Sequence, residues 1–389
     1  MLTKTNILKE QFISTREHSE WICQFLEVED FVVQPIDFVS PPKWHLAHTT
    51  WFFEEFLLKD NKENYQVFDP DFAYLFNSYY ESVGNHWIRS DRGNLSRPSV
   101  QRIREYRYYV TAAVKDFLKE EIPEKLQTIL EIGINHEQQH QELLLTDIKY
   151  ILGNNPLFPA YNKSFQENII QDYSSEWIKI EEGIYEIGLD INSSGFRYDN
   201  EMGKHKVYLE EYFISNKLVT NEEYLEFMNS GGYENVLLWH SDAWAWLEKT
   251  KINKPLYWYK IKGEWHQYTL SGLQKLDLKA PLSHISYYEA FAFAQWKGMR
   301  LPTEAEWETA QHKFDWGRRW EYTESAYVPY PNYKKPVGAI GEYNGKFMVN
   351  QKVLRGASVA TSENHSRSTY RNFFHPNMRW QFFGIRLAK

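Results

Sequence analysis

The residues with the clearest capacity for chemistry form one short pattern, His136-Glu137-Gln138-Gln139-His140. On a helix, positions i and i+4 lie on the same face, so His136 and His140 can bind one metal ion together. Imidazole nitrogens suit zinc, copper, iron and nickel. The alternative interpretation is that both histidines are ordinary polar residues on the surface of a helix.

The same five residues spell H-E-x-x-H, a pattern typical of zinc proteases. In that interpretation Glu137 is a general base that acts on a zinc-bound water, and a third ligand comes from further along the chain. The extended form H-E-x-x-H-x-x-G-x-x-H is absent after His140. Glu167 has the residue type of a third ligand, so a zinc protease stays open as an alternative hypothesis.

A second segment offers a third imidazole. Pro41-Pro42 precedes a helical pattern at 43–58, which contains His45 and His48 at i and i+3. Either histidine can complete a set of three, and the other then packs or hydrogen-bonds. Three neutral imidazoles on one side of an ion leave open positions opposite. By analogy with the two-histidine-one-carboxylate triad, an iron(II) centre of that kind can hold a thiolate, a second substrate and dioxygen.

The elements that position these histidines are helices. Helical spacing is visible at 10–27, 43–58, 100–119 and 122–152. Together with one long loop at 59–98, these segments predict a four-helix bundle over residues 1–153.

The composition and the periodicity of the sequence change after the last of these helices. Residues 154–176 are rich in Pro, Asn and Ser and lack periodicity, which predicts a linker between domains. The segments after it alternate like strands at 177–188 and 205–214 and have helical patterns at 221–230 and 286–298. We therefore expect an α+β domain with long ordered loops over residues 177–389.

Composition excludes several classes of protein. The 389 residues suggest two domains, and the net charge of −8 disfavours a general nucleic-acid binder. No apolar run reaches ~18 residues, so we expect no membrane-spanning helix. The N-terminal segment lacks the apolar core of a signal peptide, which predicts a cytoplasmic protein.

The single cysteine, Cys23, excludes a disulfide framework and a cysteine-based zinc site. Aromatic residues make up 17% of the chain. Their side chains either stabilise a loop-rich fold or line a pocket for a cationic ligand.

Several motifs taken together resemble the sulfoxide synthases of the ergothioneine pathway. In the helical half they are His48, FNSYY at 76–80 followed by ESVG at 81–84, LSRP at 95–98, and HEQQH at 136–140. In the second half, the segments 300–308, 354–358 and 379–388 resemble the formylglycine-generating-enzyme domain, a C-type-lectin-like fold. The resemblance covers about residues 10–389. It implies an α+β two-domain chain in which a DinB-like four-helix bundle carries the metal ligands.

The resemblance also implies an activity. In this family a non-haem iron(II) enzyme joins a thiol to C2 of the imidazole of hercynine (Nα-trimethylhistidine), with dioxygen as oxidant and a sulfoxide as product. By motif position, the iron(II) ligands are His48, His136 and His140, and His45 lies outside the ligand set. Formylglycine-generating enzymes themselves use cysteine chemistry, and the lone Cys23 in the helical half does not fit that role.

The resemblance further implies roles for residues in the helical half. The family has a tyrosine that donates a proton as dioxygen is reduced, and here we expect Tyr80 in that role with Tyr79 as its neighbour. Because adjacent residues of an extended loop point in opposite directions, we expect only one ring to face the metal. Arg89 and Arg92 correspond to arginines that bind the carboxylate of the thiol substrate. Gln139 lies near the metal face of its helix and is expected to hydrogen-bond the hercynine imidazole.

In the second half, the resemblance places substrate contacts at Asn372, Phe373 and Phe374. The ring of Phe373 suits a trimethylammonium group. The branch of the family that uses γ-glutamylcysteine has an acidic residue where Phe374 stands, so this chain resembles the branch that uses free cysteine. Four alternatives stay open: γ-glutamylcysteine as the thiol, a selenium donor that leads to a selenoneine precursor, the zinc protease, and a non-catalytic lectin-like binding protein.

Overall fold

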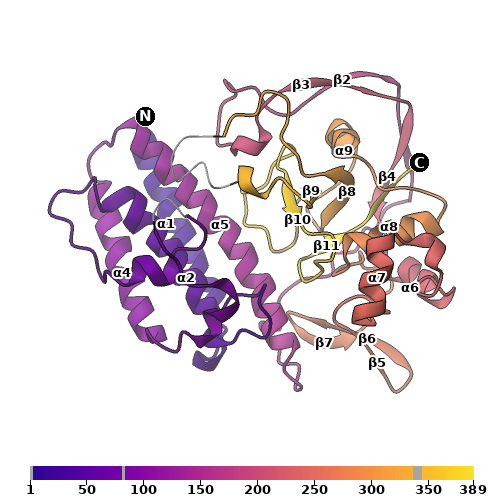
Figure 1. Cartoon of the computed structure of the whole chain (residues 1–389), viewed down its shortest axis with the longest axis horizontal. Helices are drawn as coiled ribbons and strands as arrows, with labels where there is room; N and C mark the ends of the chain where they lie inside the picture. Colours follow the sequence, from indigo (N-terminus) through magenta and orange to yellow (C-terminus); the bar gives the residue numbers. More distant parts are fainter. Residues whose placement is uncertain (1–2, 81–83, 336–343) are drawn as a thin grey trace. The chain divides into compact units, whose positions relative to one another are not determined.

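The chain divides into two compact units. The computed structural model describes residues 3–80, 84–335 and 344–389, so the motif residues 81–83 lie outside the described part. Unit 1 is Met1–Asn162 together with the short segment Ala360–His365, and unit 2 is Lys163–Val359 together with Ser366–Lys389. Unit 1 is helical and unit 2 mixes strands with helices (Figure 1), which agrees with the predicted α+β class.

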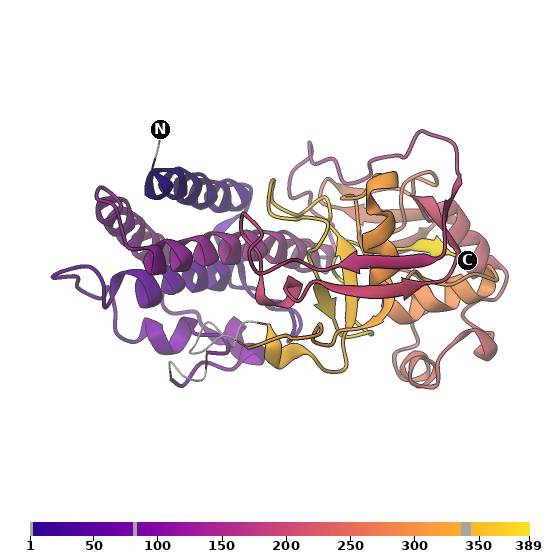
Figure 2. The same ribbon diagram turned by 90° about the horizontal axis from the view of Figure 1, so that it is seen from above.

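Unit 1 is built around four long helices, as predicted. They are α1 (Lys4–Cys23), α2 (Pro42–Phe53), α4 (Val100–Phe117) and α5 (Glu124–Gly153). Helix α1 packs against α5, and α2 packs against both α4 and α5. Figure 2 shows the long helices lying side by side. Every residue of α2 is buried, so this helix forms the centre of the bundle.

The helices begin where the sequence provides suitable residues. The hydroxyls of Thr3 and Ser99 cap α1 and α4 by accepting a backbone N–H from the first turn. Pro41 and Pro123 occupy the same position at α2 and α5, where a missing N–H costs nothing. Helix α2 ends before the predicted residue 58, because the chain continues from Phe53 as one π-helical turn, η2 (Glu54–Leu58).

The connection predicted as one long loop is partly ordered, so that prediction was wrong in part. It contains α3 (Phe72–Phe76) and the 3₁₀ turns of η3 (Arg89–Asn94), and a further 3₁₀ turn, η1 (Val28–Val32), precedes α2. Buried side chains hold it in place. The carboxylate of Glu54 accepts a hydrogen bond from Tyr65 at 2.7 Å, and the amide of Asn77 bonds both the N–H and the carbonyl of Tyr80. Such polar anchors leave no periodic pattern in a sequence.

The segment predicted as a linker, 154–176, contains no helix or strand. The division between the units falls inside it, after Asn162. Tyr161 donates a hydrogen bond to the carbonyl of Ile22 in α1 at 2.7 Å, whereas Glu167 accepts one from the N–H of Leu270 at 2.9 Å. The two ends of this segment therefore belong to different units.

Among its described residues, unit 2 contains four small sheets and four α-helices. Two sheets have three strands each, in the orders β1 (Trp177–Ile180), β4 (Tyr212–Leu218), β12 (Arg386–Ala388) and β5 (Trp258–Ile261), β6 (Glu264–Thr269), β7 (Gly272–Lys275). A four-stranded sheet has the order β10 (Asn372–Phe374), β9 (Lys352–Gly356), β8 (Trp320–Ala326), β11 (Phe383–Gly384). The last sheet pairs β2 (Gly183–Ile187) with β3 (His205–Leu209). Neighbouring strands are antiparallel except for β8 and β11. The helices are α6 (Asn221–Asn229), α7 (Ser241–Thr250), α8 (Tyr287–Trp296) and α9 (Glu304–Ala310).

The predicted helices at 221–230 and 286–298 are confirmed as α6 and α8. The predicted strand segment at 177–188 contains two strands, β1 and β2, and the segment at 205–214 contains β3 and the start of β4. Alternation alone did not reveal the interruptions at 181–182 and 210–211, because these positions are also occupied by polar residues.

The signature segment at 300–308 builds the core of unit 2. Thr303 and Glu306 form a capping box at the start of α9, and Arg300 donates two hydrogen bonds to the Glu306 carboxylate, at 2.8 and 2.6 Å. Trp307 in the same segment is fully buried and donates its indole N–H to Glu321 at 2.6 Å. This motif is therefore structural, which explains why it says little about chemistry.

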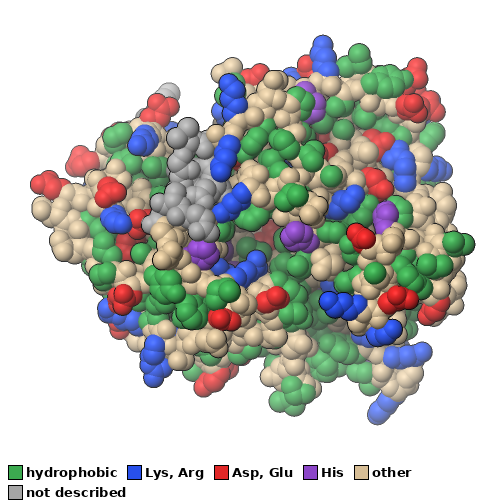
Figure 3. All heavy atoms as spheres, viewed as in Figure 1, with side chains coloured by type: hydrophobic (Ala, Val, Ile, Leu, Met, Phe, Trp, Pro, Cys, Tyr) green, Lys and Arg blue, Asp and Glu red, His purple; other side chains and the backbone are tan. Residues whose placement is uncertain are grey.

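Two further features of the structure are the apolar character of its helices and the distribution of charge on its surface. In the described part of the chain, no helix has the length and apolar character needed to cross a bilayer. On the face seen in Figure 3, acidic and basic side chains are interspersed, and neither kind gathers into a continuous band. This mixture fits a chain with 44 basic and 52 acidic residues.

Candidate metal centre

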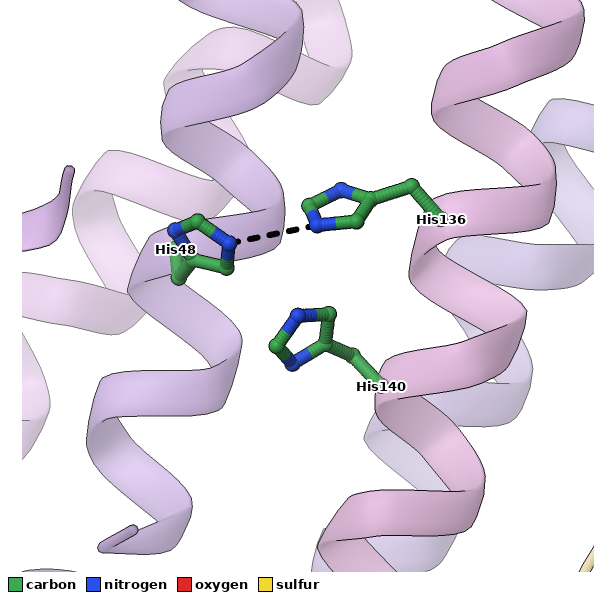
Figure 4. Close-up of side chains that lie close together, drawn as sticks. All are labelled: His48, His136 and His140. Atoms are coloured by element: carbon green, nitrogen blue, oxygen red, sulfur yellow. Dashed lines mark hydrogen bonds between the residues drawn. The ribbon is translucent and has the colours of Figure 1, made fainter. Parts of the chain in front are cut away.

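The three histidines singled out from the sequence meet within unit 1. His48 comes from α2, and His136 and His140 come from α5, one turn apart. One nitrogen of each imidazole lies within 4.8 Å of the others, and Nε2 of His48 is 3.2 Å from Nε2 of His136. Figure 4 shows the rings converging from the two helices. His48 and His136 are buried and His140 is half-buried.

The environment keeps these imidazoles neutral. Burial is the largest cause in each case: it lowers the pKa of His136 to about 3 and holds the pKa of His48 and of His140 well below the usual range. The neighbouring imidazoles of the cluster lower the pKa of His48 and His140 further. A neutral imidazole has a lone pair to offer, and a metal ion competes only with protons that bind weakly here. Three such donors suit zinc, copper, iron or nickel, so the cluster fits a metal ion.

The outer nitrogens of two of the candidate ligands have hydrogen-bond partners. Nδ1 of His48 lies 2.6 Å from the carbonyl oxygen of Phe76, at the end of α3, so the ring donates there and leaves Nε2 free for a metal. Nδ1 of His140 lies 2.9 Å from Nδ1 of His45. Outer hydrogen bonds of this kind fix the tautomer and the orientation of a metal ligand. His45 thus lies beside the cluster of His48, His136 and His140.

The glutamate of the H-E-x-x-H pattern faces away from the cluster. The buried carboxylate of Glu137 accepts hydrogen bonds from Arg16 at 2.9 Å, from Arg107 at 2.6 Å and from Ser19 at 2.6 Å. Burial raises the pKa of Glu137, but Arg107 and Arg16 outweigh this effect and bring the pKa to about 2. A carboxylate that is so weakly basic and so fully bound is a poor general base, which argues against the protease interpretation.

We expect Glu137→Gln to destabilise unit 1 strongly. The substitution leaves the guanidinium groups of Arg16 and Arg107 buried without their shared countercharge. Breaking a buried ion pair in this way typically costs about 3–5 kcal/mol. Urea unfolding followed by circular dichroism measures the loss. Glu20→Gln is the matched control, because Glu20 also pairs with Arg107 but is half exposed, and should cost no more than about 1 kcal/mol. Equal losses in the two variants would contradict this account of Glu137.

The same ion pair predicts a pH dependence of stability. The folded-state pKa of Glu137, about 2, lies below its ordinary value of 4.5, so the carboxylate stabilises the fold above pH 4.5 and loses that effect as the pH falls towards 2. The difference in unfolding free energy between wild type and Glu137→Gln should therefore shrink between about pH 5 and pH 2. A difference that stays constant over this range would mean that the charge of Glu137 is not what stabilises unit 1.

One aromatic side chain, Trp51, lies between the histidine cluster and the predicted tyrosine pair. The ring of Trp51 stacks on His48 with centroids 5.6 Å apart and also contacts the ring of Tyr80 at 5.6 Å. Tyr80 is fully buried and Tyr79 is half-buried. The expectation that the two rings point in opposite directions was wrong, because they stack on each other at 4.8 Å. The hydrogen bonds of Asn77 bend the backbone out of the extended form on which that expectation rested.

The two predicted arginines differ in their surroundings. Arg92 is buried, and its guanidinium lies 3.3 Å above the ring of Trp44, which stacks on His48 at 4.5 Å. Its two terminal nitrogens donate to the hydroxyls of Ser40 and Ser78, at 2.8 and 3.1 Å, whereas its buried Nε has no partner among the described residues. Arg92 also lowers the pKa of His48 and of His140, by less than burial and the His136 imidazole do. Arg89 is exposed and donates to the carbonyl of Phe38.

A short segment from late in the sequence completes unit 1 beside α5, the helix that carries His136 and His140. Ser362 donates to the side-chain oxygen of Gln141 at 2.5 Å, and Thr361 donates to Glu142 at 2.8 Å. The ring of His365 lies 3.2 Å from the side-chain oxygen of Gln138. Gln139, the predicted substrate contact, is half-buried on the same helix. No pattern in the sequence indicated that Ala360–His365 joins the helical unit.

The remaining predicted contacts belong to unit 2. Asn372, Phe373 and Phe374 form β10, which pairs with β9. The ring of Phe373 stacks on Tyr327 at 4.1 Å, so one of its faces is covered. Phe374 packs edge-on against Trp380 with centroids 5.5 Å apart. Glu167, the candidate third ligand of the protease hypothesis, also lies in unit 2, where its carboxylate faces His284 at 3.9 Å.

Comparison with known proteins assigns both units. Residues 11–144 match the DinB superfamily, and residues 164–319 match the sulfatase-modifying factor enzyme 1-like domain. The chain therefore joins a DinB-type helical domain to a sulfatase-modifying-factor-type domain. Since the three histidines belong to unit 1, the candidate metal centre lies in the DinB-type domain of this two-domain protein.

The two-domain protein has relatives of similar length. It is 26% identical to hercynine oxygenase of Mycolicibacterium smegmatis, over 90% of this chain and 91% of that one. It is 24% identical to hercynine oxygenase of Mycolicibacterium thermoresistibile, over 98% of this chain and 94% of that one. For hercynine oxygenase of Mycobacterium tuberculosis the identity is 26%, over 90% and 91%. These homologies confirm the family resemblance noted in the sequence.

Proposed function

We propose that this protein is an iron(II)- and dioxygen-dependent sulfoxide synthase that joins the sulfur of cysteine to C2 of the hercynine imidazole. The observation that carries the proposal is the convergence of His48, His136 and His140 on one point in the DinB-type domain. The proposed substrate, hercynine, is inferred from the relatives named hercynine oxygenase, which match the chain over most of its length. The three-imidazole donor set is compatible with iron.

The proposed reaction balances. Hercynine loses the hydrogen on C2, cysteine loses the hydrogen on sulfur, and a C–S bond forms with the release of two electrons. Oxidation of that sulfur to the sulfoxide releases two more. Dioxygen takes up the four electrons, and one of its oxygen atoms goes to sulfur while the other leaves as water. When bound, iron(II) supplies the redox chemistry that activates dioxygen.

Residues of the DinB-type domain are proposed to handle protons and to orient substrates. The buried hydroxyl of Tyr80 acts as the acid that delivers a proton during the reduction of dioxygen, with Tyr79 stacked behind it. Arg92 places a buried positive charge beside the cluster, where it attracts the cysteine carboxylate, and Arg89 adds to this charge. The amide of Gln139 hydrogen-bonds the hercynine imidazole and selects the ring carbon that meets the sulfur.

The proposed contacts of the second domain concern selectivity. Asn372 and Phe373 are assigned to hercynine, whose trimethylammonium group prefers aromatic faces and weak dipoles to hydrogen-bond donors. Phe374 is assigned to the thiol substrate. Its side chain is apolar where a γ-glutamyl amine would need an acidic partner, and this supports cysteine as the thiol.

A direct assay tests the proposal. The protein is incubated without oxygen with Fe(II), hercynine and cysteine, oxygen is then admitted, and products are identified by mass spectrometry. We expect hercynylcysteine sulfoxide, and cystine as the sole product would contradict the proposal for this substrate pair. Parallel reactions with γ-glutamylcysteine or with a selenium donor in place of cysteine, and then in competition with it, decide among the alternative donors.

We expect Phe374→Asp to shift selectivity towards γ-glutamylcysteine. A carboxylate at this position offers an ion pair to the glutamyl amine, and one added contact of about 1.4 kcal/mol corresponds to roughly tenfold in relative kcat/KM. The measurement is the ratio of kcat/KM for γ-glutamylcysteine and cysteine. Phe374→Leu is the control, since it also loses the packing on Trp380 but adds no charge. An unchanged ratio in Phe374→Asp would count against cysteine as the natural thiol.

A further inference from the structure

His45 is buried between two partners on α5, and neither partner is its neighbour in sequence. Nε2 of His45 lies 2.9 Å from Oδ2 of Asp147, and Nδ1 of His45 lies 2.9 Å from Nδ1 of the candidate ligand His140. The exposed fractions of His45 and Asp147 are 3% and 2%, so water does not compete for these contacts. The three side chains form one continuous hydrogen-bonded row.

Asp147 is itself fixed. Its Oδ2 also accepts the backbone N–H of Ser40 at 2.9 Å, just before the start of α2. The carboxylate is therefore tied to the N-terminal end of α2 while its backbone belongs to α5. Any rotation of the His45 ring would break a bond to a buried carboxylate, which is costly in a buried site.

The row permits one arrangement of protons when His140 binds a metal. A neutral imidazole has one N–H and one lone pair. If Nε2 of His140 offers its lone pair to the metal, its Nδ1 carries the proton and donates to Nδ1 of His45. The proton of His45 must then sit on Nε2, where it donates to Asp147. The same logic holds at His48, where the carbonyl of Phe76 takes the place of the His45–Asp147 pair.

We propose that His45, held by Asp147, is a positioning residue that fixes the orientation and tautomer of His140 as a metal ligand. This inference rests on the metal centre of the proposed function but not on its substrates or its reaction. The loss of such an outer partner typically lowers metal affinity by roughly 10–100-fold.

The test is the affinity for Co(II), measured without substrates by competition with a chromophoric chelator, together with the visible spectrum of bound cobalt. In His45→Met the side chain fills a similar volume but its sulfur is a weak acceptor, so we expect a loss of roughly 10–100-fold and an altered spectrum. In His45→Gln the amide oxygen can still accept from His140, so affinity and spectrum should return close to wild type. Wild-type affinity and spectrum in His45→Met would overturn the proposal.

Two further measurements separate positioning from folding. His18→Met changes a histidine on α1 that stacks on Trp21, away from the cluster, and should leave cobalt binding unchanged. Asp147→Asn removes the charge that holds His45, so we expect it to weaken binding severalfold in the wild-type background and not at all in His45→Met. Equal losses in both backgrounds, or equal losses in His45→Met and His45→Gln, would overturn the proposed row. A protein that passes these tests but makes no sulfoxide would contradict the proposed function alone.

Discussion

His136→Ala is expected to abolish metal binding and sulfoxide formation together. The substitution removes one of the three imidazoles that converge in the DinB-type domain, and the two that remain form an incomplete donor set. The loss of affinity should exceed the roughly 10–100-fold that removal of an outer partner costs. Iron binding is measured without oxygen by competition with a chelator, and product formation is measured by mass spectrometry.

His18→Ala is the matched control for this experiment. It makes the same chemical change on α1, where His18 stacks on Trp21, and should bind iron and form product as the wild type does. Because the packing of α1 on α5 and of α2 on α4 and α5 does not depend on these two side chains alone, we expect both variants to keep their helical circular dichroism. Near-normal iron affinity in a folded His136→Ala protein would remove His136 from the ligand set.

Tyr80→Phe is expected to redirect the reaction from sulfoxide to oxidised thiol. The phenylalanine ring can keep the contacts with Trp51 and Phe56, at 5.6 and 5.3 Å, so only the hydroxyl is lost. Loss of a positioned general acid typically costs about 10²–10⁴-fold in the step that it serves. We therefore expect sulfoxide formation to fall by about 100-fold or more while cystine formation continues. The ratio of the two products, measured at equal oxygen consumption, reports the change.

Tyr79→Phe provides the comparison for Tyr80. The two rings stack at 4.8 Å, so the two variants lose the same group from adjacent places in the same loop. A shift in product ratio with Tyr79→Phe and none with Tyr80→Phe would exchange their roles. An unchanged ratio in both variants would mean that neither tyrosine supplies the proton.

The sequence predicted the parts of the site that follow from helical geometry. His136 and His140 share a face because they are four residues apart, and the bundle brings His48 to them from α2. The four long helices were predicted from residues at helical spacing, and at α2, which is buried on every side, the preceding prolines marked the start of the helix. Asp147 had a detectable signal as well, since it follows His140 by seven residues and so lies on the same face of α5, but its partner His45 becomes evident only when the two helices are packed.

Other features have no local signal in the sequence. The shape of the tyrosine loop depends on Asn77, whose amide holds the backbone of Tyr80, and a single polar residue of this kind cannot be distinguished from any other loop residue. The structural role of the Glu137 carboxylate depends on Arg16 and Arg107, which lie 121 and 30 residues away along the chain. The docking of Ala360–His365 onto α5 depends on hydrogen bonds across more than 200 residues. Such long-range contacts follow from the packing of the whole chain.

The most direct test of the central claim is to locate the metal itself. Crystals of the protein loaded anaerobically with Fe(II) in the presence of hercynine are measured above and below the iron absorption edge. We predict one anomalous peak within about 2.0–2.3 Å of a ring nitrogen of each of His48, His136 and His140, as expected for metal–imidazole bonds. A peak elsewhere in the chain, or a site among these histidines that takes up zinc and excludes iron, would contradict the assignment.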